Sequence, residues 1–156
     1  MSNPTNNTVN YIDVYTRANA IADGVLIDLM QPSFADMVKQ AGFRYPIAMT
    51  KTVFSRYVEI DKLDNTHYQD LNGRLWDILW MLGLEIKSNK NRSEVFFAFI
   101  SLPNKEQAES DEYNAYIEVE PDDDLPSGFK LCQLKAVCGP NDDGKPCLTI
   151  MLSTED

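Results

Sequence analysis

The sequence has little of the chemistry on which most metal centres and catalytic sites depend. It contains one histidine, His67, and three cysteines, Cys132, Cys138 and Cys147. A single histidine cannot build a multi-histidine metal site, and no Cys/His spacing fits zinc, so we expect no metal and no cofactor. An odd number of cysteines without a Cys-x-x-Cys pair indicates reduced cytosolic thiols. Since His67 has no visible nucleophile partner, we interpret it as a solvated or capping side chain.

Long apolar runs are also missing. Residues 1–10 are polar and lack the apolar segment of a signal peptide. No run in the chain approaches the roughly 18 apolar residues that a membrane span requires. We therefore predict a cytoplasmic protein without a membrane partner.

Positive charge is scarce. The chain has 14 Lys and Arg against 24 Asp and Glu, which gives a net charge of −10. Such a balance argues against nucleic-acid phosphate or an anionic membrane surface as the main partner. It permits a basic protein partner or mimicry of nucleic acid. More often, such acidity only keeps a small cytosolic protein in solution.

The length and the apolar content, 44%, suit one globular domain. We predict a disordered lead-in over residues 1–10 and a single α+β domain over residues 11–156. In this domain a small antiparallel sheet with a C-terminal hairpin packs against several helices, because the helical patterns precede most of the strand patterns.

The longest continuous pattern, Asn65–Ser88, predicts a central helix. Between Leu75 and Leu84 it is apolar nearly all round, which is typical of a helix buried on every side, with both tryptophans inside. Asp70, Arg74 and Asp77 follow i, i+4, i+7 spacing and should share one polar face. The other elements are expected to pack around this helix.

Shorter elements are expected on both sides of the central helix. Thr16 and Thr50 are good N-caps for two of the helices. Helices are predicted over Arg17–Asp23, Ser33–Gln40 and Lys51–Ile60, and extended segments over Tyr11–Tyr15, Val25–Leu29 and Tyr116–Val119. A further segment, Glu94–Leu102, is apolar on both faces and predicts a strand that is covered on both sides, central in the sheet or next to the hairpin.

The C-terminal hairpin can be predicted down to its register. Two β-rich segments, Phe129–Cys138 and Cys147–Ser153, flank the turn sequence GPNDDGKP. Pairing their apolar rows leaves a three-residue loop, Asp142–Gly144, with Gly144 in the left-handed conformation. Cys147 then points away from Cys138, which argues against a cross-strand disulfide. The predicted pairs are Cys138 with Leu148, Ala136 with Ile150, and Leu134 with Leu152.

Polar residues that interrupt apolar segments are the candidate site. Unpaired burial of a charge costs several kcal/mol, so these side chains need partners. One interpretation is a buried ion-pair network that joins the helical half to the sheet. The other is a pocket in which Arg and Tyr hold an anionic or planar ligand. The set consists of Arg17, Asp23, Asp28, Arg44, Tyr45, Arg74, Asp77 and Lys135.

Two acidic loops are candidates for a partner-binding surface. One is PDDDLPSG, which contributes Asp122, Asp123 and Asp124. The other is the hairpin loop with Asp142 and Asp143. PDDDLPSG lacks the ligand spacing of an EF-hand, so we expect it to be a charged surface loop.

Four blocks of the chain resemble a known family. They read YTRANAIADGVLID, AGFRYPIAMT, GRLWDILWML and LKAVCGPNDDGKPCLTIML, and they extend from about Tyr15 to Leu152. They are similar to the recurring blocks of an uncharacterised domain family encoded on bacterial plasmids, integrative elements and prophages. The segment Asn104–Gly128 falls outside them. The resemblance implies an accessory protein of a mobile element in the bacterial cytosol, and it implies no reaction or ligand.

The expected function is therefore binding of another macromolecule rather than catalysis. The partner would be a host or phage protein, basic or nucleic-acid-binding. In its specific form, the protein inhibits a host defence protein by nucleic-acid mimicry, without contacting nucleic acid directly. One alternative is a small enzyme or ligand sensor that uses the Arg/Tyr/Asp set. Another is an oligomeric interaction module.

Overall fold

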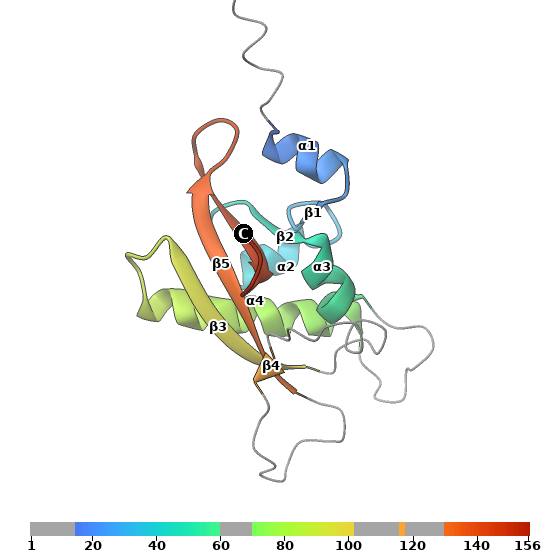
Figure 1. Ribbon diagram of the computed structural model, residues 1–156, viewed down its shortest axis with the longest axis vertical. Coiled ribbons are helices and arrows are strands. Elements are labelled where there is room, and N and C mark those ends of the chain that lie inside the picture. The colour runs from blue at the N-terminus through green and yellow to red at the C-terminus, as the bar shows by residue number, and fades with distance from the viewer. Residues whose placement is uncertain (1–14, 60–69, 102–115, 118–129) are drawn as a thin grey trace, which may run out of the picture.

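The computed structural model describes residues 15–59, 70–101, 116–117 and 130–156. They form an α+β domain in which one sheet is packed against helices, as predicted (Figure 1). In chain order the elements are α1 (Arg17–Ala22), β1 (Leu26–Asp28), α2 (Ala35–Gln40), β2 (Ile47–Thr50), α3 (Lys51–Val53), the π-helix η3 (Phe54–Val58), α4 (Leu71–Ser88), β3 (Glu94–Ser101), β4 (Tyr116–Ile117), β5 (Lys130–Pro140) and β6 (Pro146–Leu152).

The sheet is mixed rather than antiparallel. Its strand order is β1-β2-β6-β5-β3, and β4 also pairs with β5. The pairing of β2 with β6 is parallel and places Ile47 opposite Leu148 and Met49 opposite Ile150. All other pairings are antiparallel. The expected all-antiparallel sheet was wrong because β2, a four-residue strand, is too short for its period to be recognised.

The C-terminal hairpin has the predicted register. Cys138 pairs with Leu148, Ala136 with Ile150 and Leu134 with Leu152. The backbone amide of Asn141 donates to the Lys145 carbonyl at 2.7 Å and closes the three-residue loop. Gly144 in this loop has a φ of 82°. Cys147 lies opposite Gly139, and all three cysteines are free.

The central helix α4 exists, but it is buried on one side only. Asp70 caps it by accepting from the Gly73 amide, and the predicted turns before Asp70 lie outside the described residues. Leu75, Ile78, Leu79 and Leu82 are buried. On the opposite side Trp80 is 50% exposed, and Met81 and Leu84 are exposed as well. The expectation of burial on every side was wrong because the sheet and η3 cover only one face of this helix.

Of the two predicted positions for β3, the one next to the hairpin is confirmed, because β3 pairs with β5. β3 is not central, since it is the last strand in the strand order of the sheet. Its burial alternates along the strand. Phe96 and Ile100 are 44% and 49% exposed, whereas Phe97 and Phe99 face the core. The prediction of two covered faces was wrong because helices pack on only one face of this strand in the described structure (Figure 1).

The core lies between the sheet and α2, α3, η3 and α4. Its fully buried large side chains include Leu29, Val38, Met49, Tyr57, Leu79 and Leu134. The predicted N-caps are confirmed, since the hydroxyl of Thr16 accepts from the Asn19 amide and that of Thr50 from the Val53 amide.

Two further findings complete the description. β1 and β4 fall within the predicted extended segments, and of Tyr11–Tyr15 only Tyr15 belongs to the described residues. Among the helices that the structure describes, none is both long and apolar enough to cross a membrane.

Candidate functional site

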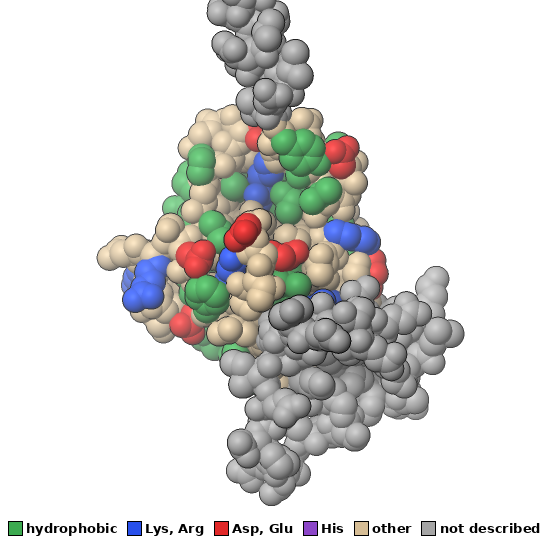
Figure 2. Space-filling view, in the orientation of Figure 1, with side chains coloured by type: hydrophobic (Ala, Val, Ile, Leu, Met, Phe, Trp, Pro, Cys, Tyr) green, Lys and Arg blue, Asp and Glu red, His purple; other side chains and the backbone are tan. Residues whose placement is uncertain are grey.

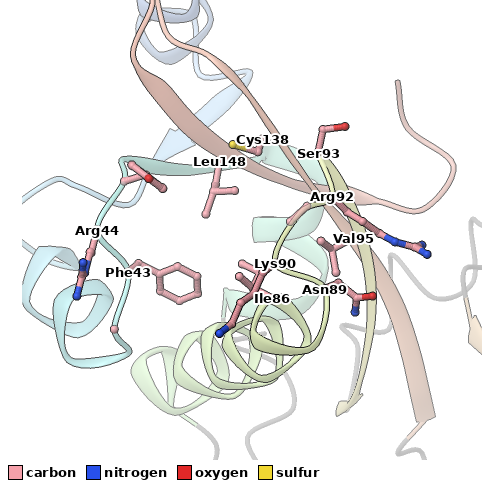
Figure 3. Close-up of a pocket in the computed structure, with 13 residues that line it drawn as sticks. Phe43, Arg44, Ile86, Asn89, Lys90, Arg92, Ser93, Val95, Cys138 and Leu148 are labelled. Carbon is pink, nitrogen blue, oxygen red and sulfur yellow. The ribbon is translucent and has the colours of Figure 1, made fainter.

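A cavity of about 260 Å³ lies where the C-terminal end of α4, the start of β3 and the segment after α2 meet the hairpin (Figure 3). We call it the basic pocket. Its interior is apolar: Phe43, Ile86, Val95, Ala136 and Leu148 line it, and the Phe43 ring and Leu148 point into it. An apolar interior with a few polar groups at the edge is the usual composition of a binding pocket.

The first wall is set by the way α2 ends. Gly42 has a φ of 95° and donates to the Lys39 carbonyl, while the Phe43 amide donates to the Val38 carbonyl. This pair of bonds is the Schellman motif, which needs a left-handed residue after the helix. It turns the chain so that the Phe43 ring packs against the core and the next two residues, Arg44 and Tyr45, lie on the rim.

The second wall follows the end of α4. The Asn89 side-chain amide donates to the carbonyl and the carboxylate of Glu85, at 3.1 and 2.9 Å. The Arg92 amide then donates to the Asn89 carbonyl, which closes a tight turn. Ser93 is anchored in the sheet because its carbonyl accepts from Cys138 at 2.7 Å. Lys90 and Arg92 are thereby held at the edge of the cavity.

The rim of the basic pocket carries positive charge only. Arg44, Lys90 and Arg92 line it, and none of its lining residues is an Asp or a Glu. All three side chains are exposed. Within the described structure none of them has a hydrogen bond or an ion pair through its charged group. Figure 3 shows Arg44 and Arg92 on opposite sides of the cavity with their guanidinium groups turned outward. The arrangement is an apolar hollow between free cations.

The predicted site residues divide between several places. Arg44 and Tyr45 belong to the basic pocket. Arg17 and Asp28 line a second, open cavity of about 490 Å³ together with Asp142 and Asp143, which we call the acidic groove. The structure thus brings together two pairs of the predicted set and not all eight.

The other predicted residues lie outside both cavities. Arg74 donates to the Glu59 carbonyl. Asp77 is on the exposed side of α4, where partial desolvation by the surrounding protein raises the pKa of its carboxyl. Asp23 accepts from the Tyr15 hydroxyl at 2.7 Å, and this bond raises the pKa of Tyr15. Lys135 is largely buried and lies between Phe96 and Met151 of the adjacent strands.

In the acidic groove the charged groups bind the fold itself. The Arg17 guanidinium donates to the Thr149 hydroxyl at 2.6 Å and to the Leu148 carbonyl at 2.7 Å. The Asp142 carboxylate accepts from the amides of Arg17 and Ala18, at 2.9 and 3.0 Å. It therefore caps the N-terminus of α1 from the hairpin loop, beside which α1 lies in Figure 1.

The remaining acidic candidates are organised locally or lie elsewhere. The carboxylates of Asp28 and Asp143 accept from the amides of Met30 and Lys145, at 2.9 and 3.0 Å. Both bonds are short-range turns of the Asx type. The predicted surface residues Asp122, Asp123 and Asp124 lie outside the described residues.

Sequence reasoning identified half of the rim of the basic pocket and missed the other half. Lys90 and Arg92 were absent from the candidate set because a lysine- and arginine-bearing turn after a helix is ordinarily a solvated loop. Phe43 was absent because the set contained only polar residues that interrupt apolar segments. One signal was available. Lys87, Lys90 and Arg92 follow one another without an acidic residue between them, which is unusual in so acidic a chain.

The chemistry that the described residues offer is that of binding. No group of three or more His, Cys, Asp or Glu side chains in the described part of the chain is placed to hold a metal ion. Cys138 and Ser93 bring a thiol and a hydroxyl to the wall of the basic pocket, which has no histidine or carboxylate in its lining to act as their base.

Fold and site together define a small α+β protein with a mixed sheet and a cation-rimmed apolar pocket. The chain belongs to DUF6573, a family of unknown function, whose sequence profile matches residues 1–156. The match includes Asn104–Gly128, which lay outside the blocks on which the resemblance rested. No curated protein and no solved structure matches the chain significantly.

Proposed function

We propose that this protein acts by binding another macromolecule and that the basic pocket is its contact site. The supporting observation is the pair of properties found there: an apolar hollow and three cations without partners. Interfaces commonly combine a buried apolar anchor with a polar, charged rim. A partner that inserts an apolar side chain and brings acidic groups beside it would match both properties.

The distribution of charge supports this contact surface. The described residues carry 12 acidic and 12 basic side chains, and the remaining segments carry 12 acidic and 2 basic ones. Figure 2 shows acidic and basic side chains intermingled on the face in view. The net charge of −10 therefore belongs to the other segments. The described residues carry no net charge, and the three cations on the rim, with no acidic residue in the lining, would attract an anionic group to the basic pocket.

The family resemblance extends the proposal to a cellular role. The protein would be an accessory factor of a bacterial mobile element that acts in the cytoplasm on a host or phage protein. If it works by nucleic-acid mimicry, the carboxylates that do so belong to segments such as Asn104–Gly128, which is rich in Asp and Glu. The basic pocket would then engage a second part of the same partner.

Affinity capture from a bacterial lysate, followed by mass spectrometry, tests the proposal. Three baits are compared. One is the unmodified protein, and the second carries Ser93→Trp, which places an indole at the mouth of the basic pocket. The third is the matched control, which carries Ser88→Trp on the exposed end of α4. We expect the unmodified protein and the Ser88→Trp control to retain the same partner and the Ser93→Trp variant to lose it. Equal retention by all three baits would contradict a contact at this pocket.

A small-ligand sensor is the second candidate, because Arg44 and Tyr45 of the predicted ligand-binding set both line the basic pocket. Guanidinium and aromatic side chains together suit planar anions. An anionic aromatic probe such as anilinonaphthalene sulfonate should then bind and compete with a natural ligand extracted from cells. Failure of cell extracts to displace the probe would remove support for this candidate.

A further inference from the structure

The outer edge of β3 has the properties of a strand that pairs with another chain. β3 has eight residues, and no strand among the described residues lies beyond it in the sheet. In Figure 1 it forms the border of the sheet opposite to β1. The other border is β1, with only three residues. An edge of this length presents a row of unpaired amides and carbonyls.

The ladder to β5 determines which backbone groups face outward. The Cys138 amide donates to the Ser93 carbonyl, so that pair is of the hydrogen-bonded kind. In an antiparallel ladder the hydrogen-bonded and non-bonded pairs alternate. Val95, Phe97 and Phe99 therefore bond to β5. The outward-directed backbone groups belong to the alternate residues, which are Glu94, Phe96, Ala98 and Ile100.

Beyond the exposed Glu94 at its start, this edge lacks the devices that normally prevent pairing. The strand contains no Pro and no Lys, and its register with β5 runs without a bulge from Glu94 to Ser101. Proteins commonly block long edges with such residues or with bulges. The outward-facing side chains after Glu94 are instead apolar, with Phe96 44% and Ile100 49% exposed.

We propose that β3 pairs antiparallel with β3 of a second copy of this chain, about a two-fold axis at Ala98. In this register Phe96 lies opposite the partner's Ile100, and Ala98 lies opposite the partner's Ala98. These residues carry the outward-directed backbone groups, so each pair exchanges both backbone hydrogen bonds. The small Ala98 lets the two copies approach at the axis. The sequence of the edge is therefore complementary to itself, as a two-fold interface requires.

The two sheets would join into one continuous sheet across the dimer. Apolar cross-strand pairs such as Phe96 with Ile100 each add about 0.2–1 kcal/mol to the backbone pairing. The interface uses none of the cations of the basic pocket, and the side chain of Val95, which does line the pocket, is buried on the opposite face of β3. The proposed dimer through β3 and the proposed partner binding at the basic pocket therefore depend on different residues, so one proposal can be disproved without the other.

Charge placement on the edge tests both the interface and its register. The variant Phe96→Glu/Ile100→Glu sets glutamates opposite each other across the axis, and Phe96→Glu/Ile100→Lys sets a glutamate opposite a lysine. Both variants carry glutamate at position 96, because this position lies opposite Lys135 on β5, where a negative charge is better tolerated than a positive one. Leu84→Glu on α4 is the matched control, since Leu84 is exposed to the same extent as Phe96.

Sedimentation of the full chain over a wide concentration range gives the answer. We expect a dimer for the unmodified protein and for Leu84→Glu, at least about a tenfold weaker dimer for the Glu/Glu variant, and recovery in the Glu/Lys variant that fades with added salt. Circular dichroism confirms that each variant is folded. A strictly monomeric unmodified protein, equal weakening of both edge variants, or loss of the dimer in Leu84→Glu would overturn the proposal.

Discussion

The basic pocket and the acidic groove both carry charged side chains and use them in opposite ways. In the groove, the Arg17 guanidinium donates to a hydroxyl and a carbonyl of β6. The Asp142 carboxylate accepts from two backbone amides of α1. In the pocket, Arg44, Lys90 and Arg92 have no such partners within the described structure. Charged residues that bind the fold stabilise it, whereas charged residues left free are available to a ligand.

The difference follows from the backbone groups around each cavity. The first amides of α1 have no acceptor within their own helix, and Asp142 supplies one. Around the pocket, the ends of α2 and α4 are already closed by the bonds of Gly42, Phe43 and Asn89. The side chains of Arg44, Lys90 and Arg92 take no part in these bonds. The comparison predicts that groove variants change stability and that pocket variants change binding.

The largest effect on stability is expected for Arg17→Ala. The substitution removes both hydrogen bonds from the Arg17 side chain to β6, each partly buried, and leaves α1 held to the hairpin loop by Asp142 alone among these contacts. Hydrogen bonds from charged groups contribute about 1.5–3 kcal/mol each, so two would contribute at least about 3 kcal/mol. Because both bonds are only partly buried, solvent weakens them, and we expect a loss of about 2 kcal/mol in the free energy of unfolding. Urea denaturation measures it. An unchanged midpoint would mean that the groove does not stabilise the fold.

A smaller loss is expected for Asp142→Ala. The variant removes the acceptor for two amides at the start of α1, in the manner of a lost N-cap. Such losses amount to about 1 kcal/mol. Asp142→Asn retains an acceptor and should recover part of the stability. If Asn and Ala destabilise equally, the carboxylate charge rather than the hydrogen-bond geometry carries the effect.

The pocket variants should have almost no effect on stability. Removing Arg44, Lys90 and Arg92 together by alanine substitution deletes no hydrogen bond or ion pair that the described structure contains. Exposed substitutions of this kind change the free energy of unfolding by about 0.5 kcal/mol or less. The same denaturation experiment checks this value. A loss as large as that of Arg17→Ala would remove the distinction between the two cavities.

The smallest effect concerns the thiol of Cys147 in the hairpin. Burial raises the pKa of Cys147, Arg17 lowers it, and Cys138, Asp142 and Asp143 raise it further. The stabilisation from the neutral thiol is therefore complete below its ordinary pKa of 9.0 and is lost as pH rises through the raised value. We expect Cys147 to react with iodoacetamide more slowly than a free thiol at pH values near 9.

Asp143→Asn is the variant that tests this electrostatic influence. It keeps an acceptor for the Lys145 amide and removes one negative charge from the surroundings of Cys147. The pKa of Cys147 should fall and its alkylation at a given alkaline pH should become slightly faster. Slower alkylation of Cys147 in this variant would contradict the assigned direction.

Much of the local structure could be predicted because its causes lie within a few residues. Thr16 and Thr50 accept from amides three residues further on, and Gly144 permits the tight loop that aligns two apolar rows. The length of α4 after Asp70 follows from its unbroken helical pattern. Of the candidate site, Arg44 and Tyr45 were recognised as polar residues in an apolar segment.

The rest could not be predicted because it depends on contacts between distant segments. Parallel pairing of β2 with β6 joins residues about one hundred positions apart, such as Ile47 and Leu148. The exposure of Trp80 and Phe96 depends on which faces the helices leave uncovered. Lys90 and Arg92 become part of a pocket only because the end of α4 meets the segment after α2.

The sequence by itself determined the α+β class, the capped helices and the register of the hairpin, since each depends on short-range hydrogen bonds and on the alternation of apolar residues. Only the tertiary structure decided which charged residues are used by the fold and which are free. A charge is satisfied or left available by the groups that surround it in space, and those groups come from α1, α2, α4 and the hairpin together.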